Sequence, residues 1–508
     1  MRTKKIIINS TFNILYQLVQ LVLSFVIRNL FVKSIGIEFL GLNGLFSNIL
    51  STLNLFELGV GVSISYHLYK PLADKDSKQI NGIMQVYRRL YFYIGIAILA
   101  IGFIIMFFIQ NMIKEQIFSL GYLRLVFFIQ LISTASTYFL AYKRTLLLAD
   151  QKSYIISITD TIVNLTMMVV RIVTLIVFNS YIVYLIVLLV QNIIGNIIIS
   201  IICSKKYSFL KYKSEGTATI RKGIFSSLKN IIIEKVSGYI YYCTDNIIIS
   251  RFVGITNVGL ISNYTLLTAT VQTFFVQIIN SVQASLGNLV NSEKDMGKVR
   301  DVFNKINFLC FAYASFSVVS FLALTQQFIT LWLGKEFVLS YTILGLLCAN
   351  YFSTTLRMPL TQMAAVYGLF NRTKIIAIWG AAINLVLSLI FVNAFGITGV
   401  LMGTAICDIV YCIGYSKIVT VKIEMPYRFY VWTVIQYIFI TISEVIATIV
   451  LGRILFNGES IGAFIGKVML CIVVPNGANI ILFRNRQEFI FLKDLIKSYC
   501  YKIVKLKK

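Results

Sequence analysis

The chain has 508 residues, of which 58% are hydrophobic and only 13% are charged, and its mean hydropathy is +0.82. A soluble globular protein carries about 25% charged residues, so this composition excludes an ordinary set of soluble domains. The net charge is +26, and the eight cysteines are scattered, with no pair at the spacing of a metal site or of a secreted disulfide framework.

Apolar segments long enough to cross a membrane recur along the whole chain. A spanning helix needs about 20 mostly apolar residues. The sequence predicts fourteen spans, at residues 10–32, 40–66, 90–110, 120–141, 154–177, 181–203, 224–250, 256–288, 305–330, 338–364, 373–393, 397–420, 429–451 and 461–483. We therefore expect an all-α integral membrane protein, in which parts of the long second and eighth spans could lie on the membrane surface.

The basic residues are concentrated in alternate loops. Of the 46 Lys and Arg residues, 34 fall on the side of the predicted membrane that holds both termini, and 6 fall on the other. Cationic loops remain in the cytoplasm, so both termini are predicted to be cytoplasmic. This rule and attraction to anionic membrane lipids account for the net charge, and no nucleic-acid partner is expected.

The two halves of the chain resemble each other at an offset near 218 residues. Residues 35–42 (IGIEFLGL) match residues 253–260 (VGITNVGL), and residues 72–76 match residues 289–295. At an offset of 220, residues 151–165 match residues 371–385. Six predicted spans separate the copies, so both halves have the same orientation, as in transporters built from parallel repeats.

This repeat predicts the domain organisation. Two six-helix bundles would occupy residues 1–205 and 224–422, with a basic cytoplasmic linker at 206–223. Residues 423–508 would add two C-terminal helices and a basic cytoplasmic tail.

Polar residues inside the predicted spans form stripes. In the first span Asn13, Gln17, Gln20 and Arg28 lie at steps of four, three and eight residues, which places them on one helical face. The fifth span repeats the pattern with Asp160, Asn164 and Arg171. Asp160 and Arg171 are too far apart, roughly 16 Å along the axis, to be simply each other's partner. Further candidates are Lys235 and Asp245 in the seventh span, Gln272, Gln277 and Asn280 in the eighth, and Arg357 in the tenth.

Charged groups inside a membrane are costly and by default face a cavity or a partner, although such residues can also simply join helices or reach the interface. Arginines bind phosphate oxygens bidentately, and amides pair with sugar hydroxyls. The ionisable residues within the spans are evenly divided in sign, so charge alone does not select a substrate. The arginines at the ends of the amide stripes favour an anionic one.

Two six-helix repeats, a basic N-terminus leading into an amide-lined first helix, and the Gly36–Gly41 turn together resemble the polysaccharide transporters of the multidrug/oligosaccharidyl-lipid/polysaccharide exporter superfamily. The stretch from Tyr242 through Asp245 and Arg251 to Gly254 is also similar to this family. The resemblance covers nearly the whole chain.

The resemblance implies a bacterial cytoplasmic-membrane flippase that works by alternating access. It would carry a lipid-linked oligosaccharide, a surface polysaccharide precursor, to the outer leaflet. Arg28 and Arg171 would receive the pyrophosphate, and Asp160 or Asp245 are the candidates for ion coupling. Polymerase and chain-length proteins of a polysaccharide pathway are possible partners.

Two other classes of function are weighed against this one. A cation-coupled drug exporter of the same superfamily would be expected to show an acidic cluster in the first span, which the sequence lacks. A membrane enzyme of polysaccharide assembly would need a larger extramembrane loop. No phosphate-binding loop or metal motif is found, so we expect neither catalysis nor a cofactor.

Overall fold

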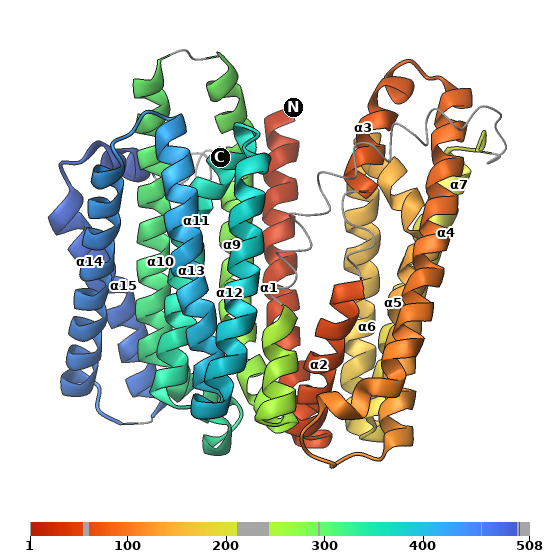
Figure 1. The fold of residues 1–508 in the computed structure, drawn as a ribbon, viewed down its shortest axis with the longest axis horizontal. Coiled ribbons are helices and arrows are strands. Elements are labelled where there is room, and N and C mark those ends of the chain that lie inside the picture. The colour runs from red at the N-terminus through yellow and green to blue at the C-terminus, as the bar shows by residue number, and fades with distance from the viewer. Residues whose placement is uncertain are drawn as a thin grey trace. The chain divides into compact units, whose positions relative to one another are not determined.

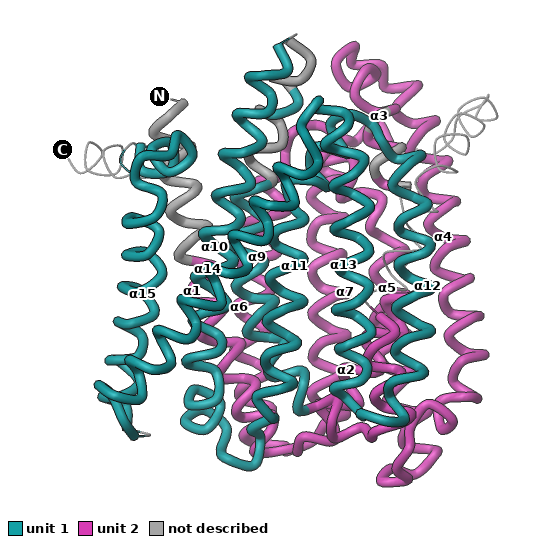
Figure 2. The backbone as a smooth tube through the Cα atoms, turned by 60° about the vertical axis from the view of Figure 1, so that its left-hand side comes forward, with its two compact units in different colours: residues 1–6, 260–508 teal, residues 7–259 magenta. Residues whose placement is uncertain are grey.

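A computed structural model describes residues 2–53, 60–210, 243–292, 295–458, 460–494 and 497. For residues 2–15, 60, 62, 63, 66, 280–285 and 288–292 it describes the backbone alone. The chain forms two compact units, which we call the N-terminal unit (residues 7–259) and the C-terminal unit (residues 260–508 with 1–6) (Figure 2). Each is described by itself.

The N-terminal unit is a bundle of long helices (Figure 1). Its helices are α1 (Arg2–Ser34), α2 (Ile37–Leu53), α3 (Val60–Ala73), α4 (Ser77–Phe108), η2 (Ile109–Met112), α5 (Leu120–Ala149), α6 (Ser153–Phe178) and α7 (Tyr181–Lys206). Residues 243–252 are helical as well. α5 packs against α2, α3, α4, α6 and α7, so it is the central helix of this bundle.

The C-terminal unit is a second helical bundle. It contains most of α9 (Ile255–Ser292), followed by α10 (Met296–Trp332), η3 (Lys335–Phe337), α11 (Tyr341–Val366), α12 (Phe370–Phe395), α13 (Ile397–Lys422), α14 (Tyr427–Leu455) and α15 (Ile461–Phe483). α10 packs against α11, α14 and α15. A cluster of Phe308, Phe311, Leu356, Tyr437 and Phe483 joins these four helices, with the Phe311 and Tyr437 rings stacked at 3.9 Å.

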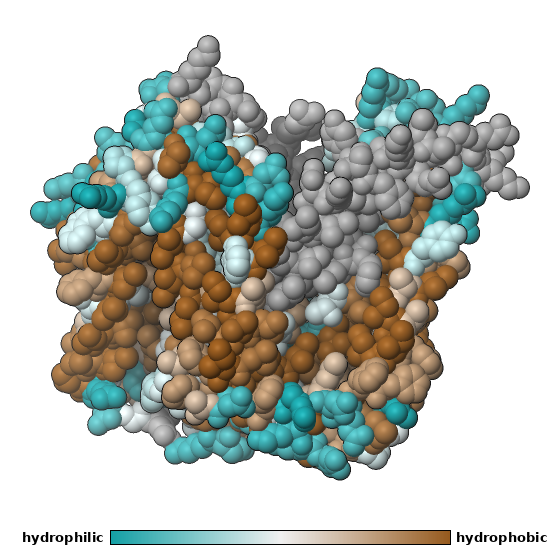
Figure 3. All heavy atoms as spheres, viewed as in Figure 1, coloured by the Kyte–Doolittle hydropathy of each residue, from teal (hydrophilic) through white to brown (hydrophobic). Residues whose placement is uncertain are grey.

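Within the part of the chain that the structure describes, ten helices are long and apolar enough to cross a membrane. In each unit the apolar surface forms a band between hydrophilic helix ends (Figure 3). Exposed large apolar side chains such as Phe103, Trp379 and Phe439 lie on the helices of this band. Such surfaces need lipid around them, so the chain is a multi-pass membrane protein.

Most predicted spans coincide with helices, and the differences have identifiable causes. α4 begins at Ser77 rather than near residue 90, because Asp76 caps it by accepting from the backbone of Lys78 and Gln79. The predicted span 40–66 is instead two helices, α2 and α3, whose connection at 54–59 lies outside the described residues. Of the predicted linker 206–223, the structure describes residues 206–210. Of the predicted span 224–250, it describes residues 243–250. The rest of both lies outside the described residues.

The sequence repeat has a structural counterpart inside the N-terminal unit. Gly36 and Gly254, 218 positions apart, both adopt a positive φ (112° and 140°) in the turn before a helix, a conformation that favours glycine. A methyl group on Gly41 would lie 2.0 Å from the carbonyl oxygen of Ile255, and one on Gly259 would lie 2.4 Å from that of Ile37. The contact is therefore reciprocal, because the same 218-residue offset relates Gly41 to Gly259 and Ile37 to Ile255.

In the C-terminal unit, α12 and α13 approach closely along a seam of small residues. A methyl group on Gly399 would lie 2.2 Å from the carbonyl oxygen of Phe391, and one on Gly403 would lie 2.6 Å from the Ser388 hydroxyl. Gly380 similarly accommodates the Tyr411 ring. Small residues at such interfaces let helix backbones approach in a membrane, where the hydrophobic effect does not drive helices together.

Candidate functional site

The polar stripe predicted on the fifth span lies on α6 and is engaged with α5 and α7. Both carboxylate oxygens of Asp160 accept from Arg144, at 2.8 Å from Nη1 and 2.8 Å from Nη2. Arg144 Nε also donates to Asn196 Oδ1 at 2.9 Å. The charge of Asp160 is therefore neutralised by a bidentate pair within the unit.

One turn further along α6, Asn164 continues the network. Its Oδ1 accepts from Gln191 Nε2 of α7 at 2.8 Å, and its Nδ2 donates to the Tyr16 hydroxyl of α1 at 3.4 Å. Gln191 Oε1 is buried and has no hydrogen-bond partner among the described residues. Asn164 thus links α1, α6 and α7. Gln191 Oε1 is the acceptor of this network that no described residue satisfies.

Arg171 ends the stripe and is engaged differently from the others. Its Nε donates to the Met167 carbonyl oxygen of its own helix at 3.4 Å. Its two terminal nitrogens bond to no residue in the described ranges, and the side chain is only half-buried. Arg171 therefore keeps most of its donors available to an anion.

The predicted residues of the first span lie on α1 in the same unit. Arg28 is half-buried beside Tyr184 of α7, whose ring packs edge-on against Phe31 at 5.0 Å. Gln17 and Gln20 are half-buried as well, whereas the side chain of Asn13 lies outside the description.

A cavity of about 290 Å³ lies between α2, α5 and α7 of the same unit. Hydroxyl and amide side chains make up most of its lining, and none of the described residues that line it is charged. Gln130 Nε2 donates to the Tyr181 hydroxyl at 3.0 Å, and Asn192 Nδ2 donates to Ser133 Oγ at 2.9 Å. A cavity of neutral donors and acceptors suits hydroxyl groups rather than an ion.

Sequence reasoning missed this cavity, although a signal for it was present. Asn43, Ser47 and Ser51 recur at steps of four residues along α2, which is the same pattern as the stripe on the first span. Arg144 was also missed, because it was assigned to a loop: α5 continues past the apolar run to Ala149, so Arg144 lies inside the bundle.

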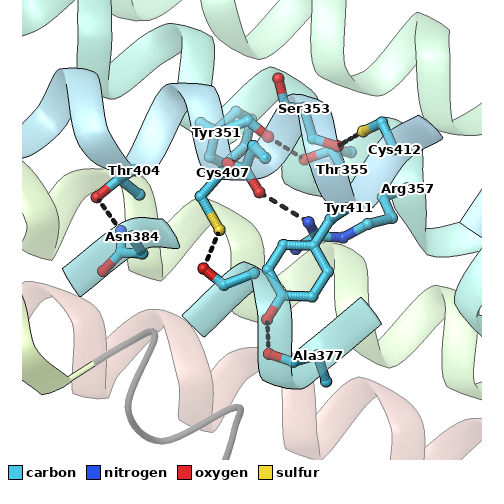
Figure 4. Close-up of polar contacts among 12 residues, drawn as sticks. Tyr351, Ser353, Thr355, Arg357, Ala377, Asn384, Thr404, Cys407, Tyr411 and Cys412 are labelled. Carbon is cyan, nitrogen blue, oxygen red and sulfur yellow. Dashed lines mark hydrogen bonds and ion pairs between the residues drawn. The ribbon is translucent and has the colours of Figure 1, made fainter. Parts of the chain in front are cut away.

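In the C-terminal unit, Arg357 of α11 is buried and paired. Its Nη1 donates to Asp408 Oδ1 of α13 at 2.8 Å, and its guanidinium lies 4.6 Å from the centre of the Tyr411 ring (Figure 4). The Tyr411 hydroxyl in turn donates to the Ala377 carbonyl oxygen at 3.1 Å (Figure 4). This arrangement holds α11, α12 and α13 together.

The remaining predicted site residues are not gathered with Arg357. Gln272 Oε1 accepts from Thr355 Oγ1 at 3.2 Å, joining α9 to α11, whereas Gln277 is exposed. Asp245 is half-buried on the helix 243–252 of the N-terminal unit. Lys235 and the side chain of Asn280 lie outside the described residues.

An apolar groove of about 740 Å³ runs between α14 and α15. Aromatic and aliphatic side chains dominate its lining, and Arg486 lies at one end. Glu444 also lines it, only 3% exposed, and accepts a hydrogen bond from Ser315 of α10.

No known protein-family profile matches the chain, and no curated protein matches it in sequence. Solved structures do match. An inward-facing multidrug resistance MATE family transporter of the MOP superfamily has a TM-score of 0.67 at 15% identity, covering 80% of this chain and 94% of its own. The lipid II flippase MurJ, in an inward closed conformation, has a TM-score of 0.63 at 16% identity, covering 93% and 98%. A MOP superfamily transporter from Pyrococcus furiosus, whose binding pocket is described as of reversed polarity, has a TM-score of 0.55 at 14% identity, covering 83% and 96%.

The fold is that of the membrane transporters of the MOP superfamily. The all-α architecture with many membrane-spanning helices agrees with the fold class predicted from the sequence. Among these neighbours, MurJ matches the larger share of this chain.

Proposed function

We propose that the protein is a flippase that moves a lipid-linked oligosaccharide, a precursor of surface polysaccharide, from the cytoplasmic to the outer leaflet of a bacterial cytoplasmic membrane. The observation that carries the proposal is the polar content of the N-terminal unit. It combines Arg171, whose terminal nitrogens are available, with a neutral cavity of amides and hydroxyls. A pyrophosphate needs cationic donors such as those of Arg171, and a glycan needs amides and hydroxyls such as those of the cavity.

The apolar groove between α14 and α15 supports a substrate with a hydrocarbon chain. A polyprenyl tail would remain in the lipid while its head group crosses, and a groove on the two C-terminal helices would give that tail a fixed path. The name of one structural neighbour, a lipid II flippase, agrees with a substrate of this type.

The alternative is a cation-coupled drug exporter, which the MATE neighbours favour. A cationic drug needs an available carboxylate. Two carboxylates within the spans are already neutralised by arginine, Asp160 by Arg144 and Asp408 by Arg357. These two pairs remove Asp160 and Asp408 as partners for a cation, which favours an anionic substrate.

The first experiment is depletion of the protein in its own cells, followed by rescue. We expect lipid-linked oligosaccharide to accumulate in the inner leaflet and surface glycan to fall. Wild type should reverse both effects, and a variant carrying Arg28→Ala and Arg171→Ala should not, at equal membrane abundance. Arg453→Ala removes one exposed arginine from the end of α14 and should rescue fully.

Unchanged glycan and lipid intermediates on depletion would contradict the flippase proposal and favour the exporter. A depletion phenotype that the double variant rescues would retain the flippase and discard its phosphate site.

A further inference from the structure

A surface pocket on the N-terminal unit has no role in the function proposed above. It has a volume of about 650 Å³ and lies between α4 and α5, lined by Gln85, Arg88, Arg89, Phe92, Tyr93 and Phe139. Among the described residues, two guanidinium groups and no carboxylate contribute to it, so its charge is that of an anion site. Arg89 forms no hydrogen bond or ion pair with any residue that the structure describes.

The aromatic floor of the pocket depends on a glycine. A methyl group on Gly95 of α4 would lie 3.1 Å from the Phe139 ring of α5, so glycine lets that ring lie directly against α4. Phe92 and Tyr93 flank it and are 52% and 65% exposed. Three rings therefore form a concave apolar surface beside the two arginines.

The position of the pocket along α4 matches a lipid boundary. The residues that follow the arginines, 90–108, are almost entirely apolar. At 1.5 Å per residue, this run is about 28 Å long, close to the thickness of the hydrocarbon core of a bilayer. The arginines thus lie at the level of lipid phosphates, and the rings lie just below them, next to the acyl chains.

The same face of α4 is turned to lipid along the apolar run of the helix. Phe92, Ile96, Phe103 and Phe107 are each more than two-fifths exposed and lie on one side of the helix. Arg88 precedes Phe92 by four residues, and Arg89 precedes Tyr93 by four, so both arginines lie at the end of this lipid-facing side.

We propose that this pocket is a binding site for one anionic glycerophospholipid. Arg88 and Arg89 bind the phosphate, and the Phe92, Tyr93 and Phe139 rings hold the upper part of an acyl chain. Basic pockets between membrane helices at this depth bind anionic head groups, which zwitterionic lipids match less well. The pocket is lined by α4 and α5, whereas the proposed phosphate site is on α1 and α6.

The test uses the full-length protein, purified in detergent, with binding measured by native mass spectrometry and by thermal stabilisation. The probes are phosphatidylglycerol, phosphatidylcholine and inorganic phosphate. We expect phosphatidylglycerol to bind more tightly than phosphatidylcholine, and the variant Arg88→Gln with Arg89→Gln to lose about tenfold or more of that affinity. Phe92→Ala with Tyr93→Ala should weaken both lipids alike.

The matched control is Lys205→Gln with Lys206→Gln, which removes two adjacent exposed cations at the last turn of α7. It should retain phosphatidylglycerol binding. Equal loss in this control would overturn the proposal in favour of unspecific surface charge. If inorganic phosphate stabilised the protein to the same extent as phosphatidylglycerol, the pocket would be reassigned to a free anion. Displacement of phosphatidylglycerol by a polyprenyl-pyrophosphate glycolipid, at lower concentration, would reassign it to the transport substrate.

Discussion

At the level of single residues, the charged groups inside the two units differ in whether they are already paired. Arg144 binds both carboxylate oxygens of Asp160, and Arg357 is paired with Asp408 through Oδ1, whereas the two terminal nitrogens of Arg171 bond to no described residue. Removing one member of a buried pair leaves the other charge without compensation, which costs more than the pair itself contributes.

This reasoning gives a first prediction for the Arg357–Asp408 pair. Arg357→Ala should destabilise the protein by about 3–5 kcal/mol, because it leaves the fully buried Asp408 uncompensated. The double change Arg357→Met with Asp408→Leu should cost much less. Thermal unfolding in detergent measures both. The half-exposed pair Lys305–Asp301 is the control, and Lys305→Ala should cost about 0–1 kcal/mol. Similar losses in both pairs would contradict the prediction.

A second prediction concerns Asp150, at the end of α5 and outside the spans. Partial burial acts to raise its pKa, but hydrogen bonds from Lys152 and Tyr207 outweigh burial, and the pKa lies below its ordinary value. The carboxylate therefore stabilises the fold above its ordinary pKa of about 3.9, and this contribution is lost as the pH falls through the lower, folded-state value.

Hydrogen exchange at the α5–α6 turn, measured between neutral pH and pH of about 3, tests this. Wild type should lose protection on acidification, and Asp150→Asn should show less protection at neutral pH and a smaller change. The same pH response in both proteins would exclude Asp150 as the responsible group.

At the level of helices, close packing depends on where a side chain is absent. The α12–α13 seam places Gly399 and Gly403 against the backbone and side chains of α12. In a membrane, such contacts supply much of the attraction between helices.

A third prediction follows for this seam. Gly399→Ala should destabilise the C-terminal unit by about 1–3 kcal/mol, because the new methyl group would overlap the Phe391 carbonyl oxygen and push the helices apart. Gly345→Ala on α11 is the matched control: apart from its own helix, no described residue lies within 4 Å of the added carbon, so alanine there should be neutral or slightly stabilising. Thermal unfolding compares the two. If both substitutions changed the stability equally, helix propensity and not packing at the seam would account for the effect.

Helices were also the level at which the sequence was most informative. The predicted spans 154–177, 181–203 and 461–483 coincide with α6, α7 and α15 to within three residues, because about 20 apolar residues have few alternatives in a membrane. The ends of the helices were less predictable. Hydropathy falls at the membrane boundary while the hydrogen-bonded helix continues, as in α4 and α5.

That difference explains what was missed at the candidate site. The stripe on α6 could be found from spacing, but the partner of Asp160 could not, since Arg144 lies beyond the apolar part of α5. The pairing of Arg357 with Asp408 joins residues 51 positions apart on two helices, and spacing along one helix carries no information about it.

At the level of the whole molecule, the repeat connects positions that lie far apart in the sequence. Gly41 and Gly259 are equivalent by the 218-residue offset. Each faces the carbonyl oxygen of the residue four positions before the other glycine. Their effects on stability should therefore be alike and coupled.

The fourth prediction uses this coupling. Gly41→Ala and Gly259→Ala should each destabilise the protein by a similar amount, about 1–3 kcal/mol, because each methyl group would overlap a carbonyl oxygen. The double variant should cost less than the sum, since helices already separated by one methyl group accommodate the second. Gly121→Ala, with open space around the added carbon, is the control. Thermal unfolding of all four variants provides the cycle, and strict additivity would count against a shared contact.

The reciprocal contact also bears on how such a chain could arise. A surface in which position i meets position j and position j meets position i is self-complementary, as in a symmetric dimer. An ancestor of half the length, crossing the membrane an even number of times, could have joined two identical copies through this glycine surface. Gene fusion would then have preserved an existing interface, and the two copies of the turn would have remained bound to each other while the polar residues of the two halves diverged.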